Sequence, residues 1–151
     1  MTAPAVLERE DIAARIPHQG RMCLLDRVRA WDAASVTCTA ASHRDPDNPL
    51  RSAGGLPSPC AIEYAAQAMA LHGALVAPAE GGPRPGFLAS VRDARFAVAR
   101  LDLLPGELEI RVRRLAGTGS QVLYQFQVSS DGAPVAEGRA AVVLDTPLPP
   151  A

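Results

Sequence analysis

One acid and one amide interrupt an otherwise apolar stretch of the sequence, and their spacing favours chemistry. Glu63 and Gln67 lie four residues apart in AIEYAAQAMALHGALV, so on a helix they share one stripe. Burying a carboxyl is costly without a purpose, and a carboxyl held in such a place is suited to proton transfer. We therefore take Glu63 as a candidate general acid. Gln67 is a candidate support that holds Glu63 or a loop by a hydrogen bond. The alternative is a solvated or structurally bonded carboxyl.

Each of the three histidines has a chemical and a structural interpretation. His43 follows a small-residue strand and opens a polar loop, which makes it a candidate base; otherwise it is a surface residue. Helical pitch places His72 away from the stripe of Glu63, which favours a satisfied core or interface residue. His18 stands beside Pro17 in a turn, where a positional role is favoured over catalysis.

Composition bounds what kind of protein this is. The chain has 151 residues, 48% of them hydrophobic, which predicts one domain over residues 1–145 and a Pro-rich tail over 146–151. A net charge of −1 excludes a general nucleic-acid binder. All 15 basic residues are Arg, so Schiff-base chemistry on a lysine is excluded. Cys23, Cys38 and Cys60 show no metal-binding or disulfide spacing, so we expect neither a metal nor a cofactor.

The N-terminal segment MTAPAVLEREDIAARI contains acidic residues and lacks the apolar core of a signal peptide. No window approaches ~18 uninterrupted apolar residues, the length that a membrane-spanning helix needs. We therefore expect a cytoplasmic protein without a membrane span.

Sequence periodicity predicts the elements that position these residues. Residues 58–76 form the clearest helix, with Ser58 as N-cap and Pro59 at its first position. Small and apolar residues cover most of its circumference, which indicates a helix buried on nearly all sides. A short helix is expected at 7–16 and strands at 22–28, 35–42, 86–99, 106–115, 120–129 and 133–144, with turns at 117–119 and 130–132. The predicted class is α+β, a central helix enclosed by an antiparallel sheet.

Several segments, in their order and spacing, resemble one known family. The opening IPHQGRM…LLDRV and the helix IEYAAQA are similar to the 3-hydroxyacyl-acyl-carrier-protein dehydratases. The resemblance is closest to the dehydratase-like subunits of aryl polyene biosynthesis. It extends through HRDPDNPLR, GGLP, EYAAQAMALHG, PGFLASVRD and EGRAAVVL, and so covers most of the chain.

The resemblance implies a hot-dog fold and dehydration of 3-hydroxyacyl thioesters, with Glu63 as the acid. The common dehydratase pattern places a His fourteen residues before the helical acid, where this chain has Pro49. His43, at the start of the same loop, is then the candidate for the base. In this fold the loop base and the helical acid are expected to meet across a dimer interface, so Glu63 should lie near His43 of a neighbouring subunit.

A thioester-oxygen site is expected at the start of the long helix. Gly54 and Gly55 allow a close backbone approach to a ligand, and the N–H groups of Cys60 and Ala61 are expected to point out of the helix start. The alternative is an ordinary flexible loop.

The implied partner is an acyl carrier protein bearing a phosphopantetheine-linked acyl group. Carrier proteins are acidic, so arginines are expected to ring the substrate entrance. Arg84 and Arg92 are the first candidates, followed by Arg95 and Arg100; the alternative is ordinary solvated strand faces. The family resemblance also implies a homodimer, or a heterodimer with a related dehydratase subunit.

Three functions fit these observations. The first is a dehydratase acting on carrier-bound 3-hydroxyacyl groups. The second is a non-catalytic or half-catalytic partner subunit of a heteromeric dehydratase, which the missing loop His favours. The third is an acyl thioesterase, because one fold serves several chemistries and Glu63 is able to activate water.

Overall fold

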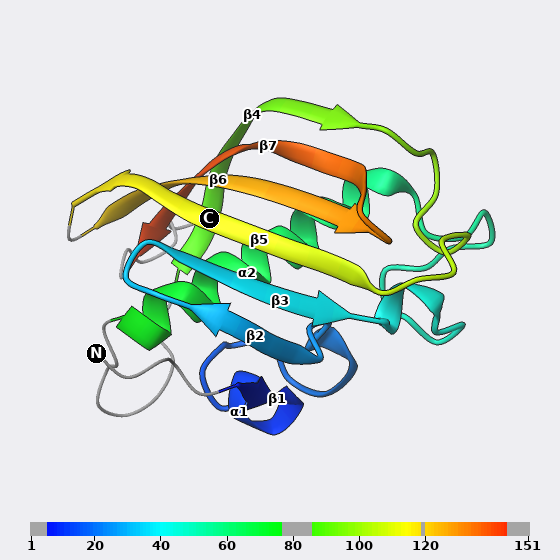
Figure 1. Ribbon diagram of the computed structural model, residues 1–151, viewed down its shortest axis with the longest axis horizontal. Coiled ribbons are helices and arrows are strands. Elements are labelled where there is room, and N and C mark those ends of the chain that lie inside the picture. Colours follow the sequence, from blue (N-terminus) through cyan, green and yellow to red (C-terminus); the bar gives the residue numbers. More distant parts are fainter. Residues whose placement is uncertain (1–5, 77–85, 119, 145–151) are drawn as a thin grey trace, which may run out of the picture.

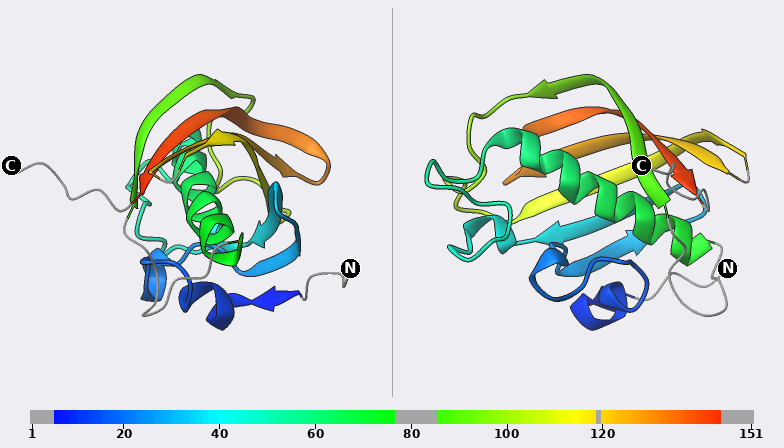
Figure 2. Two further views of the ribbon diagram at one scale, coloured as in Figure 1. Left: turned by 90° about the vertical axis from the view of Figure 1, so that its left-hand side faces the viewer. Right: turned by 180° about the vertical axis from the view of Figure 1, so that it is seen from behind.

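A single antiparallel sheet curves around one long helix, α2 (Figures 1 and 2). The computed structural model describes residues 6–76, 86–118 and 120–144. Its seven-stranded sheet has the order β1-β2-β3-β5-β6-β7-β4, and every neighbouring pair runs antiparallel. This architecture confirms the predicted α+β arrangement of a central helix enclosed by a sheet.

The elements follow one another as expected from the periodicity. The strands are β1 Leu7–Glu8, β2 Arg27–Trp31, β3 Ser35–Ala40, β4 Gly86–Phe96, β5 Leu108–Gly117, β6 Gln121–Ser130 and β7 Ala133–Leu144. The helices are α1 Arg9–Ala13 and α2 Ala61–Val76, with 3-10 turns at Gly20–Met22, Ser42–Arg44 and Ser58–Cys60. No helix among residues 6–76, 86–118 and 120–144 is long and apolar enough to cross a membrane.

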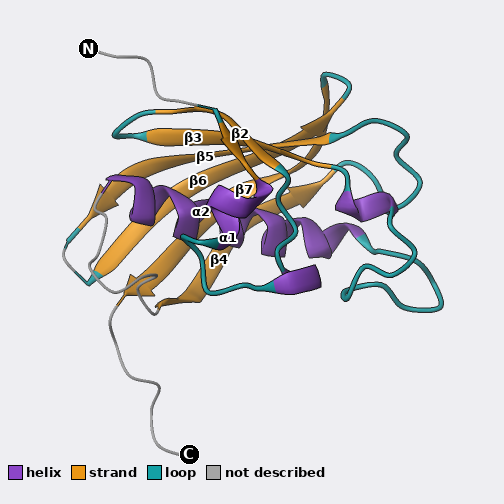
Figure 3. Ribbon diagram, turned by 90° about the horizontal axis from the view of Figure 1, so that it is seen from below, coloured by secondary structure: helices purple, strands orange, loops and turns teal. Residues whose placement is uncertain are grey.

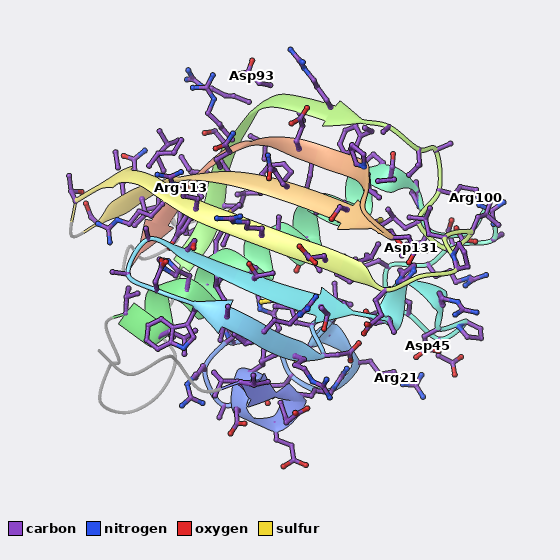
Figure 4. The ribbon with its side chains drawn as sticks, in the orientation of Figure 1. Arg21, Asp45, Asp93, Arg100, Arg113 and Asp131 are labelled. Atoms are coloured by element: carbon purple, nitrogen blue, oxygen red, sulfur yellow. The ribbon has the colours of Figure 1, made fainter. Side chains whose placement is uncertain are left out.

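Helix α2 is buried because its residues are small and the sheet bends over it. Met69 is 2% exposed and Leu71 is completely buried, as a central helix requires. Seen from below, α2 lies along the inner face of the sheet (Figure 3). The inner face supplies alternate apolar side chains of each strand, such as Leu108, Ile110 and Val112 of β5, which are 0% exposed. Arg113, which directly follows Val112 in this alternation, is exposed on the outer face (Figure 4).

Strands β5, β6 and β7 form an antiparallel meander, and β4, which precedes them in the sequence, pairs with β7 at the edge of the sheet. The turn between β6 and β7 contains Asp131 (φ 50°) and Gly132 (φ 78°), the two left-handed residues of a type I′ hairpin. Phe126 of β6 stands opposite Gly138 of β7, and a Cβ on Gly138 would meet the Phe126 ring at 2.8 Å. Glycine is therefore required where this ring crosses the neighbouring strand.

Three predicted boundaries are wrong for identifiable reasons. The expected helix at 7–16 shrinks to α1, because Leu7–Glu8 pair with β2. The strand expected at 22–28 begins only at Arg27, since the backbone before it bonds to a side chain of α2 instead. Ser58 is not the N-cap of α2: its N–H donates to Ala99 O and its own 3-10 turn precedes the helix.

His72 is a satisfied core residue, as its place on the helix predicted. It is fully buried; Nδ1 lies 2.8 Å from Tyr124 Oη and Nε2 3.0 Å from Asp32 O. The neutral ring suits both contacts, since Nε2–H donates to the carbonyl and Nδ1 accepts from the hydroxyl. Burial lowers the pKa of His72 below its ordinary value of 6.5, mainly by desolvating the charged form.

We predict that His72 makes the protein less stable in mild acid. Its folded pKa is lowered, so the unfolded chain takes up the proton at a higher pH than the folded one. The free energy of unfolding should therefore fall as the pH drops below 6.5, by up to about 1.4 kcal/mol per pH unit for this proton. Urea unfolding of the wild type and His72→Gln between pH 7 and 5 measures the difference. Parallel stability profiles for the two proteins would contradict the prediction.

Candidate active site

Glu63 meets a histidine of its own chain at the start of α2. His18 Nε2 lies 3.3 Å from Glu63 Oε1, and the two side chains are 27% and 34% exposed. Glu63 is in the first turn of α2, whereas His18 lies in the connection between α1 and the 3-10 turn Gly20–Met22. An imidazole and a carboxyl thus share a hydrogen bond at a place that solvent and small molecules reach.

Contact with His18 sets the protonation of the acid. The hydrogen bond from His18 is the main cause that lowers the pKa of Glu63 below its ordinary value of 4.5; burial opposes it, and a bond from Gln67 adds to it. At neutral pH Glu63 is therefore ionised in the resting protein. The helix N-terminus also favours the negative charge.

Gln67 is the completely buried link between α2 and the segment that follows His18. Its Nε2 donates to Met22 O at 2.6 Å and to Glu63 Oε1 at 3.3 Å, and its Oε1 accepts from Leu24 N at 2.9 Å. One amide therefore fixes both the carboxyl of Glu63 and the backbone of residues 22–24. Both uses expected of Gln67, holding Glu63 and holding a loop, therefore occur together.

The connection that contains His18 is also fixed by hydrogen bonds to α1. Gln19 Nε2 donates to Ala13 O at 2.7 Å, and Arg9 Nη2 donates to Gly20 O at 3.1 Å. Gly20 has a φ of +59°, a left-handed conformation that a side chain disfavours. Nδ1 of His18 is shielded from solvent, and it has no hydrogen-bond partner within the part of the chain that is described.

The structure gives His43 a different place from the one expected. The 3-10 turn that ends β3 directs the side chain inward, where it is fully buried and Nε2 contacts Leu104 O at 3.1 Å. Desolvation lowers the pKa of His43. Because its own subunit encloses the ring, His43 has no exposed surface to offer to Glu63 of a neighbour. The imidazole beside Glu63 is that of His18.

The amides expected to bind a thioester oxygen already have acceptors. Gly55 N donates to Ser52 O at 2.9 Å within a tight turn, and Gly55 has a φ of +95°. Cys60 N donates to Pro57 O, and Ala61 N to Ser58 O and Pro59 O. The N–H groups of Cys60 and Ala61, which were expected to point out of the helix start, are engaged because a 3-10 turn precedes α2. Gly54 lies in the same tight turn, between Ser52 and Gly55.

The candidate arginines divide into different settings. Arg92 is exposed on the edge strand β4, as is Arg95, and Arg84 lies outside the described residues. Arg100 is engaged elsewhere: its guanidinium bonds the buried carboxylate of Asp102, with Nε 3.1 Å from Oδ1. That pairing holds the pKa of Asp102 well below its usual range. Figure 4 shows Arg100 among the loops at one end of the molecule.

No cluster of three or more His, Cys, Asp or Glu side chains suited to a metal ion occurs in the described ranges. Cys23 and Cys38 are buried and Cys60 is half-buried, each as a free thiol. Burial raises the pKa of Cys38 to about 12, so this thiol is inert. Acid–base chemistry by His18 and Glu63 is what the site offers.

The sheet wrapped around α2 defines a hot-dog protein, and comparisons with known proteins then identify its family. A family model of the ApeP-like ApeP dehydratases matches residues 10–147. The chain therefore belongs to the ApeP-like dehydratase family, as the sequence resemblance indicated. No curated protein matches the chain.

Solved structures share the fold. The dehydratase heterocomplex ApeI:P from Xenorhabdus doucetiae contains a chain that superposes with a TM-score of 0.79 at 23% identity, over 93% of this chain and 92% of that one. A thioesterase from Staphylococcus aureus (0.60, 12% identity, 79% and 92% covered) and one from Haemophilus influenzae (0.56, 13%, 81% and 79%) are also similar. At these identities the likeness shows the fold alone.

Gln67 should stabilise the folded state by several kcal/mol. Gln67→Leu keeps the volume but strips Met22 O and Leu24 N of their partner, at about 1–3 kcal/mol for each buried group. We expect the free energy of unfolding in urea to fall by roughly 2–4 kcal/mol. Gln125→Leu, on the exposed outer face of β6, is the matched control and should change it little. Equal losses for the two variants would show that the bridge is not structural.

Proposed function

We propose that this protein dehydrates 3-hydroxyacyl thioesters carried on acyl carrier protein, in aryl polyene biosynthesis, with His18 and Glu63 as its acid–base pair. One observation carries the proposal: in a member of a dehydratase family, the acid of the central helix bonds an imidazole, and both side chains are partly exposed. The sequence favoured His43 as the base. Because His43 is buried, we assign this role to His18 instead.

The pair needs to hold a single proton. At the start of the reaction this proton lies on Glu63, beside a neutral His18, and the 3.3 Å contact is the path by which it returns to Glu63 after each turnover. His18 then takes the proton from C2 of the acyl chain, and Glu63 gives its proton to the 3-hydroxyl. The C2–H and C3–O bonds break, the C2=C3 double bond forms, and the hydroxyl leaves as water.

A thioesterase is the second candidate because proteins of that class share the fold. Hydrolysis needs a base that activates water against the thioester carbonyl, and an ionised Glu63 also fits that role. Membership of a dehydratase family favours dehydration over hydrolysis. The two reactions give products of different mass, so they are readily told apart.

A partner subunit is proposed on the basis of surfaces that one chain leaves uncovered. The stripe of Ile62, Ala66, Ala70 and Gly73 along α2 is only half-buried. Strand β4 is an edge of the sheet and carries two exposed aromatic rings, Phe87 and Phe96. That a similar chain was solved in a dehydratase heterocomplex supports a related dehydratase subunit as partner, with a second copy as the alternative. This proposal includes the alternative that the chain is a helper subunit without catalytic activity of its own.

We propose that an acidic carrier protein docks on the arginines near the edge strand β4. Arg92 is exposed on β4 and supports this proposal by its charge, and Arg84 belongs to the same proposal from the sequence. The phosphopantetheine arm would bring the acyl chain to Glu63. No resident cofactor is needed for the proposed reaction.

We predict that purified protein converts a 3-hydroxyacyl carrier protein into the enoyl form. Mass spectrometry should show loss of one water, whereas a thioesterase would release the acyl chain and a helper subunit would do neither alone. Glu63→Gln and His18→Ala should each lower the rate by about 10²–10⁴-fold, because each removes one half of the proton exchange. Glu109→Gln, an exposed acid on the outer face of β5, is the control and should retain the rate.

The proposal fails if the wild type, alone and with a dehydratase partner, releases no water from the substrate. It also fails in its assignment of residues if His18→Ala keeps the wild-type rate. A variant His43→Gln then tests the earlier candidate directly, with circular dichroism to verify that the buried substitution has not unfolded the chain.

We predict an assembly larger than one chain. Sedimentation velocity at micromolar concentration should give a dimer for the protein alone or with a co-expressed dehydratase subunit. Ala70→Arg, in the half-buried stripe of α2, should dissociate it by placing a charge where the partner packs. Ala116→Arg, at an exposed position of β5, should leave the dimer intact. A wild-type monomer under both conditions would contradict the prediction.

A further inference from the structure

A buried chain of hydrogen bonds runs from the loop before α2 to the segment that follows His18. Asn48 Nδ2 lies 3.1 Å from Tyr64 Oη, Tyr64 Oη 2.7 Å from Ser42 Oγ, and Ser42 Oγ 2.7 Å from Leu24 O. Tyr64 is 0% and Asn48 5% exposed, and Ser42 is half-buried. These three contacts join three segments distant in sequence, at Leu24, at Ser42 with Asn48, and at Tyr64.

The direction of every bond in the chain is determined. A carbonyl only accepts, so the single hydroxyl proton of Ser42 goes to Leu24 O. Tyr64 must then donate its own proton to Ser42 Oγ, and Asn48 donates to Tyr64 Oη. Burial raises the pKa of Tyr64, so its hydroxyl keeps the proton at neutral pH. Bonds aligned in this way strengthen one another in a buried setting.

The hydrogen-bond chain ends at Leu24, a residue that Gln67 of α2 also binds. Leu24 O accepts from Ser42, and Leu24 N donates to Gln67 Oε1. Both polar groups of one residue are thus fixed to partners on or beside α2, at the end of the segment that leads from His18. Tyr64 directly follows Glu63 on the helix, so the hydrogen-bond chain passes through the neighbour of the acid and ends at Leu24, six residues after His18.

The loop that supplies Asn48 is also where the common dehydratase pattern has its histidine. Here Pro49 occupies that position, and the preceding Asn48 uses both amide protons for the network: one for Tyr64 Oη and one for Ser42 O at 2.8 Å. Its Oδ1 accepts from Leu50 N at 2.8 Å. The side chain of Asn48 is thus used to hold other segments in place.

We propose that Tyr64, acting with Ser42 and Asn48, is a positioning residue that keeps His18 within hydrogen-bond reach of Glu63. The inference rests on the proposed function of that pair. Tyr64 itself touches neither reacting group. It acts by holding the backbone at Leu24, and a shift of about 1 Å there is enough to cost a large part of the rate.

The test compares two buried tyrosines that each lose one hydroxyl. Tyr64→Phe removes the link to Ser42, whereas Tyr124→Phe removes an equally buried hydroxyl that bonds His72. For Tyr64→Phe we expect kcat to fall by about 10- to 100-fold with KM unchanged, and Ser42→Ala to behave likewise. For Tyr124→Phe we expect a comparable loss of thermal stability with kcat retained.

A second measurement does not depend on activity. A ¹³C NMR titration of the Glu63 carboxyl should give a pKa that rises toward the ordinary value in Tyr64→Phe, because the bond from His18 is the main cause of its lowering, and that stays low in Tyr124→Phe. If the wild type dehydrates nothing, the proposed function fails while this titration still decides the positioning role. A Glu63 titration identical in the two variants would overturn the inference.

Discussion

Enclosing α2 on nearly all sides obliges every polar group on it to find a partner. The small residues of the helix let the sheet close over it, so water does not satisfy its side chains. Tyr64, Gln67 and His72 are each completely buried, and each is hydrogen-bonded. Their partners lie in four separate parts of the chain, at Met22–Leu24, at Asp32, at Ser42 and Asn48, and at Tyr124. The same bonds that satisfy the helix therefore fasten these segments to it.

Glu63 is the exception that makes chemistry accessible. It shares the stripe of Gln67 but lies one turn nearer the helix start, where the side chain remains 34% exposed. Gln67 fixes its carboxyl from inside the protein and His18 contacts it from the neighbouring connection. A carboxyl in this setting keeps its charge, because the hydrogen bonds it accepts outweigh the desolvation that would raise its pKa.

The fold by itself does not determine which reaction the protein catalyses. Thioesterases with 12–13% identity share the wrapped helix, so the chemistry depends on which side chains reach the start of that helix. In this chain the loop before α2 contributes Asn48 to a structural network and leaves Pro49 where related dehydratases are expected to have a histidine. The imidazole comes instead from the connection between α1 and β2. Family membership and local geometry are thus two independent reasons to consider proton transfer.

Local pattern in the sequence was enough to determine the architecture. The small-residue run of α2, the alternation of β5 to β7 and the Asp131–Gly132 turn depend on neighbours within a few residues, so each was predicted correctly. The pairing of Glu63 with Gln67 followed from helical spacing for the same reason.

Tertiary structure decided which histidine meets the acid. His18 and Glu63 are far apart in the sequence, and long-range bonds such as those of Met22 and Leu24 to Gln67 bring them together. His43 is buried and contacts Leu104 O, 61 residues further along the chain. The N–H groups of Cys60 and Ala61 are engaged by a 3-10 turn that local propensity did not reveal. The family resemblance included His18, but nothing in its immediate sequence distinguishes a turn residue from a reactive one, because the contact that does so is long-range.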